Sequence, residues 1–229
     1  MNILIYGDTL TSPALRHEVP ISIGDPFLYL EAEGHRAVLT NALEDERIAR
    51  DAPQLERILE EQMGRDELIA SGLSRAEIDR ETCVRAVDRF EIKQAVVPPD
   101  FPIALADRLR GSGVTLAWDE DVFIDRRRHK SAAEMEGIRR AAGAAVAAMG
   151  EAAAMLREAE IDGDRLLLSG ALLTAEAVRE RIREVCGRAG APAPPDIMVK
   201  PMGPNPAGGH DPGAGPLPAR ADRDRPVAA

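Results

Sequence analysis

The chain has 229 residues, a formal net charge of −10 at pH 7 and a hydrophobic content of 45%. This length and composition suffice for one large or two small domains with a buried core. The negative charge argues against nucleic acid and membranes as partners, and an aromatic content of 3% argues against a platform for stacking bases.

The cysteines and the beginning of the chain indicate a cytoplasmic protein. Cys83 and Cys186 are distant in sequence and form no Cys-x-x-Cys motif, which favours a reducing compartment. The apolar run Ile3–Tyr6 follows no basic region and ends at once in Gly7 and Asp8, unlike a signal peptide. No apolar run approaches membrane-spanning length.

The first half of the chain alternates predicted strands with predicted helices, which is typical of an α/β domain, here assigned to residues 1–128. The strands are expected at 3–6, 26–30, 37–40, 92–97 and 114–118. The helices are expected after Asn41, over Leu55–Met63, after the capping box Ser74–Glu77 and after Asp100. His17 and His35 have no partner at metal-ligand spacing, so both are expected to be surface histidines.

The second half predicts two helices behind a charged connector, Asp125–Lys130. Ser131–Glu134 forms a capping box, and small residues such as Gly137 and Gly143 suggest that the helix after it packs closely against another element. The apolar stripe of this helix consists of Met135, Ile138, Ala142, Ala145, Val146 and Met149.

The second predicted helix begins at Thr174, which can cap it, with Leu173 and Val178 as a hydrophobic staple. Cys186 lies on its apolar stripe and is interpreted as a core residue, because no histidine is placed to activate it as a nucleophile.

Proline and glycine fill residues 191–218 too densely for a helix or a central strand. Ile197–Val199 is one short apolar run in this stretch that could form a strand. His210 follows between Gly209 and Asp211, as a group that titrates near neutral pH. A disordered linker would have the same composition.

The order of these parts resembles the amino-terminal part of the pita-bread metallopeptidases, which include Xaa-Pro aminopeptidase, proline dipeptidase and their non-peptidase relative creatinase. The stretches that carry the resemblance cover roughly the whole chain: Ala95–Pro102 with Leu109–Val114, Arg128–Arg139, Leu173–Glu176, Asp196–Val199 and Pro204–His210.

The resemblance implies an α/β fold with a creatinase-like amino-terminal domain at residues 1–128. The first, incomplete part of an α+β pita-bread domain, in the order helix, helix, strand and loop, is then expected at residues 129–229. Residues from about 190 to 229 are expected to be poorly ordered, because the strand would lack the sheet that completes it in the family.

The resemblance also implies a catalytic role for His210, whose counterpart in the family contacts the substrate near the scissile bond. The family holds two divalent metals, for example Mn, Co or Zn, with five ligands that follow the loop histidine. Asp222 and Asp224 lie in a charged run and do not match those ligands. The chain is therefore expected to be truncated, to bind no metal and to be inactive alone.

The function that the resemblance implies is metal-dependent removal of a residue ahead of proline, or cleavage of an Xaa-Pro dipeptide, in a longer relative. A non-catalytic fragment or interaction module is the alternative, with a possible homodimer through the α/β domain. A creatinase-like hydrolase without metals is a third possibility. A natural truncation, a frameshift and a gene-model error all remain open as the origin of the short chain.

Overall fold

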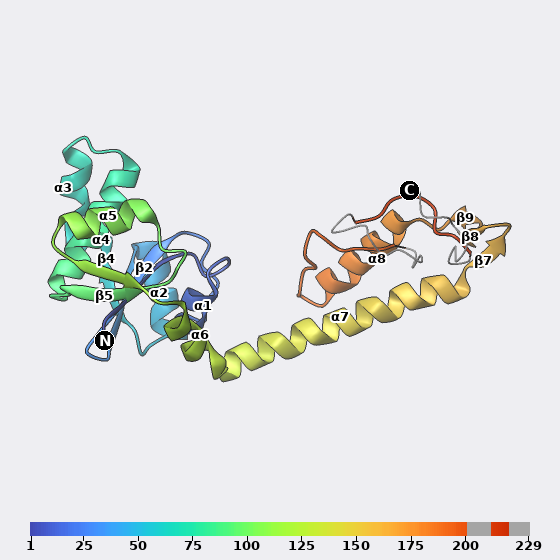
Figure 1. Ribbon diagram of the computed structural model, residues 1–229, viewed down its shortest axis with the longest axis horizontal. Helices are drawn as coiled ribbons and strands as arrows, with labels where there is room; N and C mark the ends of the chain where they lie inside the picture. Colours follow the sequence, from blue (N-terminus) through green and yellow to red (C-terminus); the bar gives the residue numbers. More distant parts are fainter. Residues whose placement is uncertain (201–211, 220–229) are drawn as a thin grey trace, which may run out of the picture. The chain divides into compact units, whose positions relative to one another are not determined.

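The computed structural model describes residues 1–200 and 212–219, and contacts within the chain define two compact units, Met1–Glu134 and Met135–Ala229 (Figure 1). The assignment of domains to residues 1–128 and 129–229 stays a prediction. Among the described residues, no helix is both long enough and apolar enough to cross a membrane.

A mixed six-stranded sheet organises the first unit, with the strand order β4-β3-β2-β1-β5-β6. Strands β1, β2 and β3 are antiparallel neighbours, whereas β3–β4, β1–β5 and β5–β6 are parallel pairs. The strands are β1 (Ile3–Gly7), β2 (Phe27–Ala32), β3 (His35–Thr40), β4 (Glu56–Leu59), β5 (Gln94–Val97) and β6 (Thr115–Trp118). The predicted mixed α/β class is confirmed.

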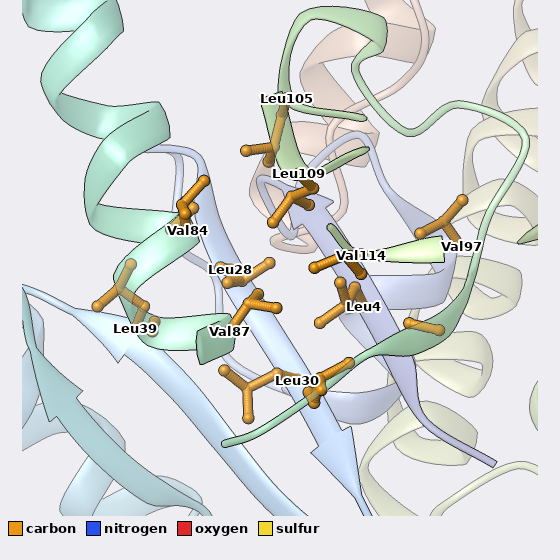
Figure 2. Close-up of a cluster of buried hydrophobic side chains, with 14 of the residues drawn as sticks. Leu4, Leu28, Leu30, Leu39, Val84, Val87, Val97, Leu105, Leu109 and Val114 are labelled. Carbon is orange, nitrogen blue, oxygen red and sulfur yellow. The ribbon is translucent and has the colours of Figure 1, made fainter. Parts of the chain in front are cut away.

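Helices cover both faces of this sheet, so the central strands are apolar at consecutive positions rather than at alternate ones. In β1, Leu4 belongs to a core that α4 and α5 cover, and its neighbours Ile3 and Ile5 belong to a second core under α1, α2 and α6. Figure 2 shows the first of these cores. The helices are α1 (Pro13–Glu18), α2 (Ala42–Asp51), α3 (Arg65–Ala70), α4 (Arg75–Arg89), α5 (Ile103–Gly111) and α6 (Glu120–Arg128).

Local capping signals were good predictors of where helices begin. The Asn41 side chain accepts hydrogen bonds at the start of α2, and Ser74 and Glu77 form the expected capping box of α4. Asp100 was the exception, because α5 begins only at Ile103, with Pro102 in the capping position. Helices α1 and α3 were not predicted.

The helix predicted over Leu55–Met63 is wrong. The stretch instead forms β4 and a 3₁₀ turn, η1 (Glu60–Met63). Ile58 is fully buried and pairs with Leu39 of β3. A short apolar run has the same spacing in a helix and in a buried strand, and only the neighbouring strand decides between them.

The prediction that Asp125–Lys130 is a charged connector is also wrong. Most of it belongs to α6, and Arg126 is bound inside the first unit rather than solvated. Its guanidinium donates to Glu18 and to Glu31, in each case over 2.6 Å.

The second unit begins within the long helix α7 (Ala132–Glu158) and continues with a three-stranded antiparallel sheet that was not predicted. The capping box at its start is confirmed, because Ser131 and Glu134 exchange hydrogen bonds. The remaining elements are β7 (Glu160–Asp162), β8 (Arg165–Leu168), β9 (Ala171–Leu172) and α8 (Ala175–Arg188).

The packing face of α7 differs from the predicted stripe. Val146 and Met149 are 71% and 72% exposed, and Gly137 and Gly143 have no close neighbour among the described residues. The buried residues are instead Ala144 and Ala148, which form a small core with Cys186 of α8. The predicted packing face of this helix is therefore wrong.

Candidate functional site

His210, the predicted catalytic residue, lies outside the described residues, as do Asp211, Asp222 and Asp224. The described chain on either side of it, residues 191–200 and 212–219, is placed against α8. The candidate site is therefore built from α8 and these two flanking segments.

The two flanking segments meet at a backbone hydrogen bond. Val199 N–H donates to the carbonyl oxygen of Pro212 over 3.1 Å. The expected strand Ile197–Val199 is absent from this part of the described chain, and Val199 is held by this hydrogen bond and by packing against the cluster that contains Val178 and Leu217. The glycine and proline content prevents a regular ladder here.

Position 213 requires glycine for two reasons. Its φ is +77°, in the left-handed region that side chains disfavour. A Cβ atom at this position would also lie 2.2 Å from the carbonyl oxygen of Val199. The close approach of the two flanking segments therefore depends on Gly213.

Arg179 of α8 binds the chain that follows His210. Its Nη1 donates to the carbonyl oxygens of Pro212 and Gly213 over 2.6 and 2.7 Å. The side chain is only 10% exposed, and its carboxylate partner in α8, Glu176, is 3.7 Å away. A buried guanidinium is costly unless it is hydrogen-bonded, so these carbonyl contacts hold both the arginine and the chain in place.

Glu176 binds the same segment from the first turn of α8. Both of its carboxylate oxygens lie 3.1 Å from the N–H of Gly215, which donates to them. Its own backbone N–H and that of Gly215 hold the pKa of the Glu176 carboxyl below its usual value. We call Glu176 and Arg179 the α8 clamp.

The start of α8 has the predicted capping chemistry. Thr174 accepts a hydrogen bond from Ala177 N–H over 3.2 Å, and Leu173 and Val178 are buried in one cluster, as expected for a hydrophobic staple. Leu217 joins that cluster, and its N–H donates to the carbonyl oxygen of Leu173. The segment after the clamp is thus fixed to the helix start.

Two hollows in the second unit border this arrangement. One, of about 530 Å³, is charged and is lined by the α8 clamp with Glu180, Arg183 and Pro195 among others. The other, of about 610 Å³, is mainly apolar and lies between α7, α8 and residues 190–198. Cys186 lines the second hollow but is buried, consistent with a core role.

Metal-ligating side chains do not gather in the described part of the chain. No group of three or more His, Cys, Asp or Glu side chains there could hold a metal ion. Asp196 is exposed on the flanking segment and belongs to no such group of described residues. The described residues therefore do not fit a two-metal centre, which needs several converging carboxylates.

The two early histidines differ from each other. His35 is 68% exposed, as expected. His17 is not a free surface residue, because its Nδ1 lies 3.1 and 3.2 Å from the two carboxylate oxygens of Glu134. Sequence reasoning missed both this pair and the α8 clamp. The partners of the histidine pair are 117 residues apart, those of the clamp are more than 30 residues apart, and no sequence motif links either set.

The chain has the fold of the amino-terminal part of the Xaa-Pro peptidases. No family model and no curated protein matches the sequence. An Xaa-Pro dipeptidase from Bacillus anthracis matches the structure with a TM-score of 0.57 and 13% identity, over 82% of this chain and 44% of that one.

Two further solved structures agree with this finding. An X-Pro aminopeptidase from Thermotoga maritima has a TM-score of 0.54 at 12% identity, over 82% of this chain and 47% of that one. The prolidase from Pyrococcus horikoshii has a TM-score of 0.53 at 15% identity, over 82% and 44%. The chain thus spans less than half the length of these structures, and the likeness establishes the fold.

Proposed function

We propose that this chain forms the amino-terminal part of a metal-dependent Xaa-Pro peptidase. The substrates would be peptides with proline in the second position, or Xaa-Pro dipeptides. The observation that carries the proposal is the fold match over 82% of the chain to proteins described as an Xaa-Pro dipeptidase and an X-Pro aminopeptidase.

The second part of the proposal is that the 229-residue chain does not hydrolyse these peptides alone. When bound, two divalent metals such as Mn, Co or Zn would polarise the scissile carbonyl and supply a hydroxide nucleophile. The described residues offer no group that could hold them. The ligands would therefore come from sequence outside these residues.

We further assign His210 a role in contacting the substrate and handling a proton in the active enzyme. Such a group must be held within hydrogen-bond reach of the reacting amide. The hydrogen bond between Val199 and Pro212 supports this role, because it joins the described residues on either side of the segment that contains His210. The α8 clamp holds that point from the helix.

A non-catalytic interaction module is the second candidate function. The observation in its favour is that the first unit has a complete core on both faces of its sheet without any residue of the second unit. Such a unit could serve as a homodimer contact whether or not catalysis occurs.

The test is direct. The purified chain should bind no stoichiometric Mn²⁺, Co²⁺ or Zn²⁺ by calorimetry and should not release proline from Xaa-Pro substrates. Metal-stimulated turnover that a chelator abolishes would show that the chain is sufficient alone, and would contradict the second part of the proposal.

A test of the peptidase assignment itself requires a longer protein, which contains this chain and any coding sequence that follows it in the gene. That protein should be active, and His210→Ala should lower kcat by about 10²–10⁴-fold, as expected for loss of a positioned proton-transfer group. His35→Ala is the matched control, because His35 is exposed in the first unit. Inactivity of the longer protein on every Xaa-Pro substrate would leave the interaction module as the function.

A further inference from the structure

The first unit contains a polar hollow of about 460 Å³ that has no part in the proposed peptidase function. Its lining comes from the end of α1, from β3, from α6 and from the residues between α6 and α7. All of these lining residues belong to the first unit. The volume lies within the range of small-molecule pockets, about 300–1,000 Å³.

The most buried part of the hollow is already neutralised by an ion pair. Glu18 is the one carboxylate among the described lining residues, and its side chain is only 5% exposed. Arg126 Nε donates to a Glu18 oxygen over 2.6 Å, and Arg126 Nη2 donates to Glu31 over the same distance. Arg126 and Glu18 are therefore used within the fold and are not free to bind a ligand.

Arg36, by contrast, has hydrogen-bonding capacity left. Its Nε lies 3.5 Å from Glu31 and its Nη1 lies 4.0 Å from Glu18, both longer than the usual range of about 2.7–3.2 Å. The Glu31 oxygen concerned already accepts hydrogen bonds from Arg126 and Tyr29. Because a guanidinium has five N–H donors and this side chain is 48% exposed, Arg36 can bind a further acceptor.

The residues between α6 and α7 supply a second cation. Lys130 is exposed, and its ammonium donates to the carbonyl oxygen of Arg127 but pairs with no carboxylate of the described chain. An ammonium has three N–H donors, so two remain for a ligand. The side chains of His129 and Gln54 also line the hollow and make no hydrogen bond to another described residue.

The unused groups of the hollow are therefore mainly donors, and two of them carry a permanent positive charge. Charged donors bind most strongly to anionic oxygen acceptors. We propose that this hollow binds a small molecule through a phosphate or carboxylate group, with Arg36 and Lys130 as the main partners of that group. The site concerns the first unit alone, and it does not depend on the proposed peptidase function.

Two histidine rings report on the hollow directly. His17 and His129 line it, whereas His35 stacks on Phe90 with ring centroids 6.1 Å apart and does not line it. In the purified 229-residue chain, the imidazole NMR signals are assigned with single His→Gln variants. Inorganic phosphate or citrate, titrated at constant pH and ionic strength, should shift the signals of His17 and His129 in a saturable way and leave that of His35 unchanged.

The two anions distinguish the chemistry of the bound group. A response to phosphate alone identifies a phosphate site, and a response to citrate alone identifies a carboxylate site. The absence of a saturable shift of His17 and His129 with either anion would overturn the proposal.

Two substitutions test the proposed contacts. Arg36→Gln and Lys130→Gln should each weaken anion binding about tenfold, because each removes charge-assisted hydrogen bonds to the ligand. Lys130 is exposed, so Lys130→Gln remains informative if Arg36→Gln fails to fold. Arg128→Gln is the matched control: it removes the same charge nearby, but Arg128 pairs with Asp125 in an exposed position and does not line the hollow.

The control should bind the anion with the affinity of the original chain. Equal weakening by Arg128→Gln would mean that the anion responds to the general charge of the surface, and would overturn the proposed site. An affinity that neither Arg36→Gln nor Lys130→Gln changes would overturn it as well.

Discussion

At the scale of single residues, the base of the segment that carries His210 depends on backbone geometry more than on side-chain chemistry. Gly213 is held where the carbonyl oxygen of Val199 leaves no room for a Cβ atom. Gly215, two residues later, has nearly the same φ, +78°, but a Cβ atom there would meet no described atom within 4 Å. Substitution of these two glycines therefore separates the free-energy cost of the left-handed conformation from the free-energy cost of the steric contact.

We expect Gly215→Ala to lower the free energy of unfolding of the second unit by about 1–2 kcal/mol, the usual cost of a left-handed conformation for a residue with a side chain. Gly213→Ala should cost about 1–3 kcal/mol more, because the contact with Val199 forces the two segments apart. Urea unfolding followed by circular dichroism measures both variants. Equal losses for the two would show that the segments separate without cost.

At the scale of elements, α6 is held to the first unit by charge as well as by the buried side chain of Phe123. Arg126 bridges Glu18 of α1 and Glu31 of β2, and both carboxylates are nearly buried. Tyr29 donates to the same two carboxylates. A connector that looks solvated in sequence is therefore a structural part of the domain.

Arg126→Ala should destabilise the chain by about 3 kcal/mol or more, because it leaves two largely buried carboxylates without their main partner. Arg128→Ala is the matched control. Arg128 lies on the same helix and pairs with Asp125 in an exposed position, so its loss should cost about 0–1 kcal/mol. Chemical denaturation of the two variants makes the comparison, and similar losses would mean that the Arg126 bridge contributes little.

The same bridge predicts a dependence on pH. Burial raises the pKa of the Glu31 carboxyl, but hydrogen bonds from Arg126 and Tyr29 outweigh burial and hold the pKa below its usual value. The stabilisation is therefore fully present above the unfolded pKa of about 4.3 and is lost as the pH falls through the lower folded pKa. Stability measured from pH 7 downward should fall less steeply in Arg126→Ala; an unchanged slope would argue against this linkage.

At the scale of the whole molecule, the chain consists of two units that contain separate cores. The last residue of the first unit, Glu134, lies in the first turn of α7 and pairs with His17. The helix start is thereby tied to α1, and residues 129–134 belong with the first unit by their contacts.

We expect residues 1–134 to unfold cooperatively when expressed alone, since their core needs no residue of the second unit. A fragment of residues 1–128 should fold too but melt at a lower temperature, because it lacks Glu134 and the contact with His17. Calorimetry of both fragments provides the test. A fragment of residues 1–134 that melts without cooperativity, or that binds the dye ANS, would show that the first unit depends on the second.

The sequence alone was sufficient for features that depend on near neighbours in the chain. Helix starts at Asn41, Ser74, Ser131 and Thr174 were predictable because a capping side chain binds backbone groups within three residues of itself. The α/β class followed from alternating apolar runs, and the order of motifs led to the Xaa-Pro peptidase fold that the solved structures support.

Features that depend on distant partners were decided only by the tertiary structure. Residues 56–59 became a strand because β3 lies beside them, and α7 buried Ala144 and Ala148 because α8 approaches that face. The α8 clamp joins residues more than 30 positions apart, and its arginine binds carbonyl oxygens, which every residue has. Such a contact leaves no pattern in the sequence, because its geometry arises only when the chain has folded.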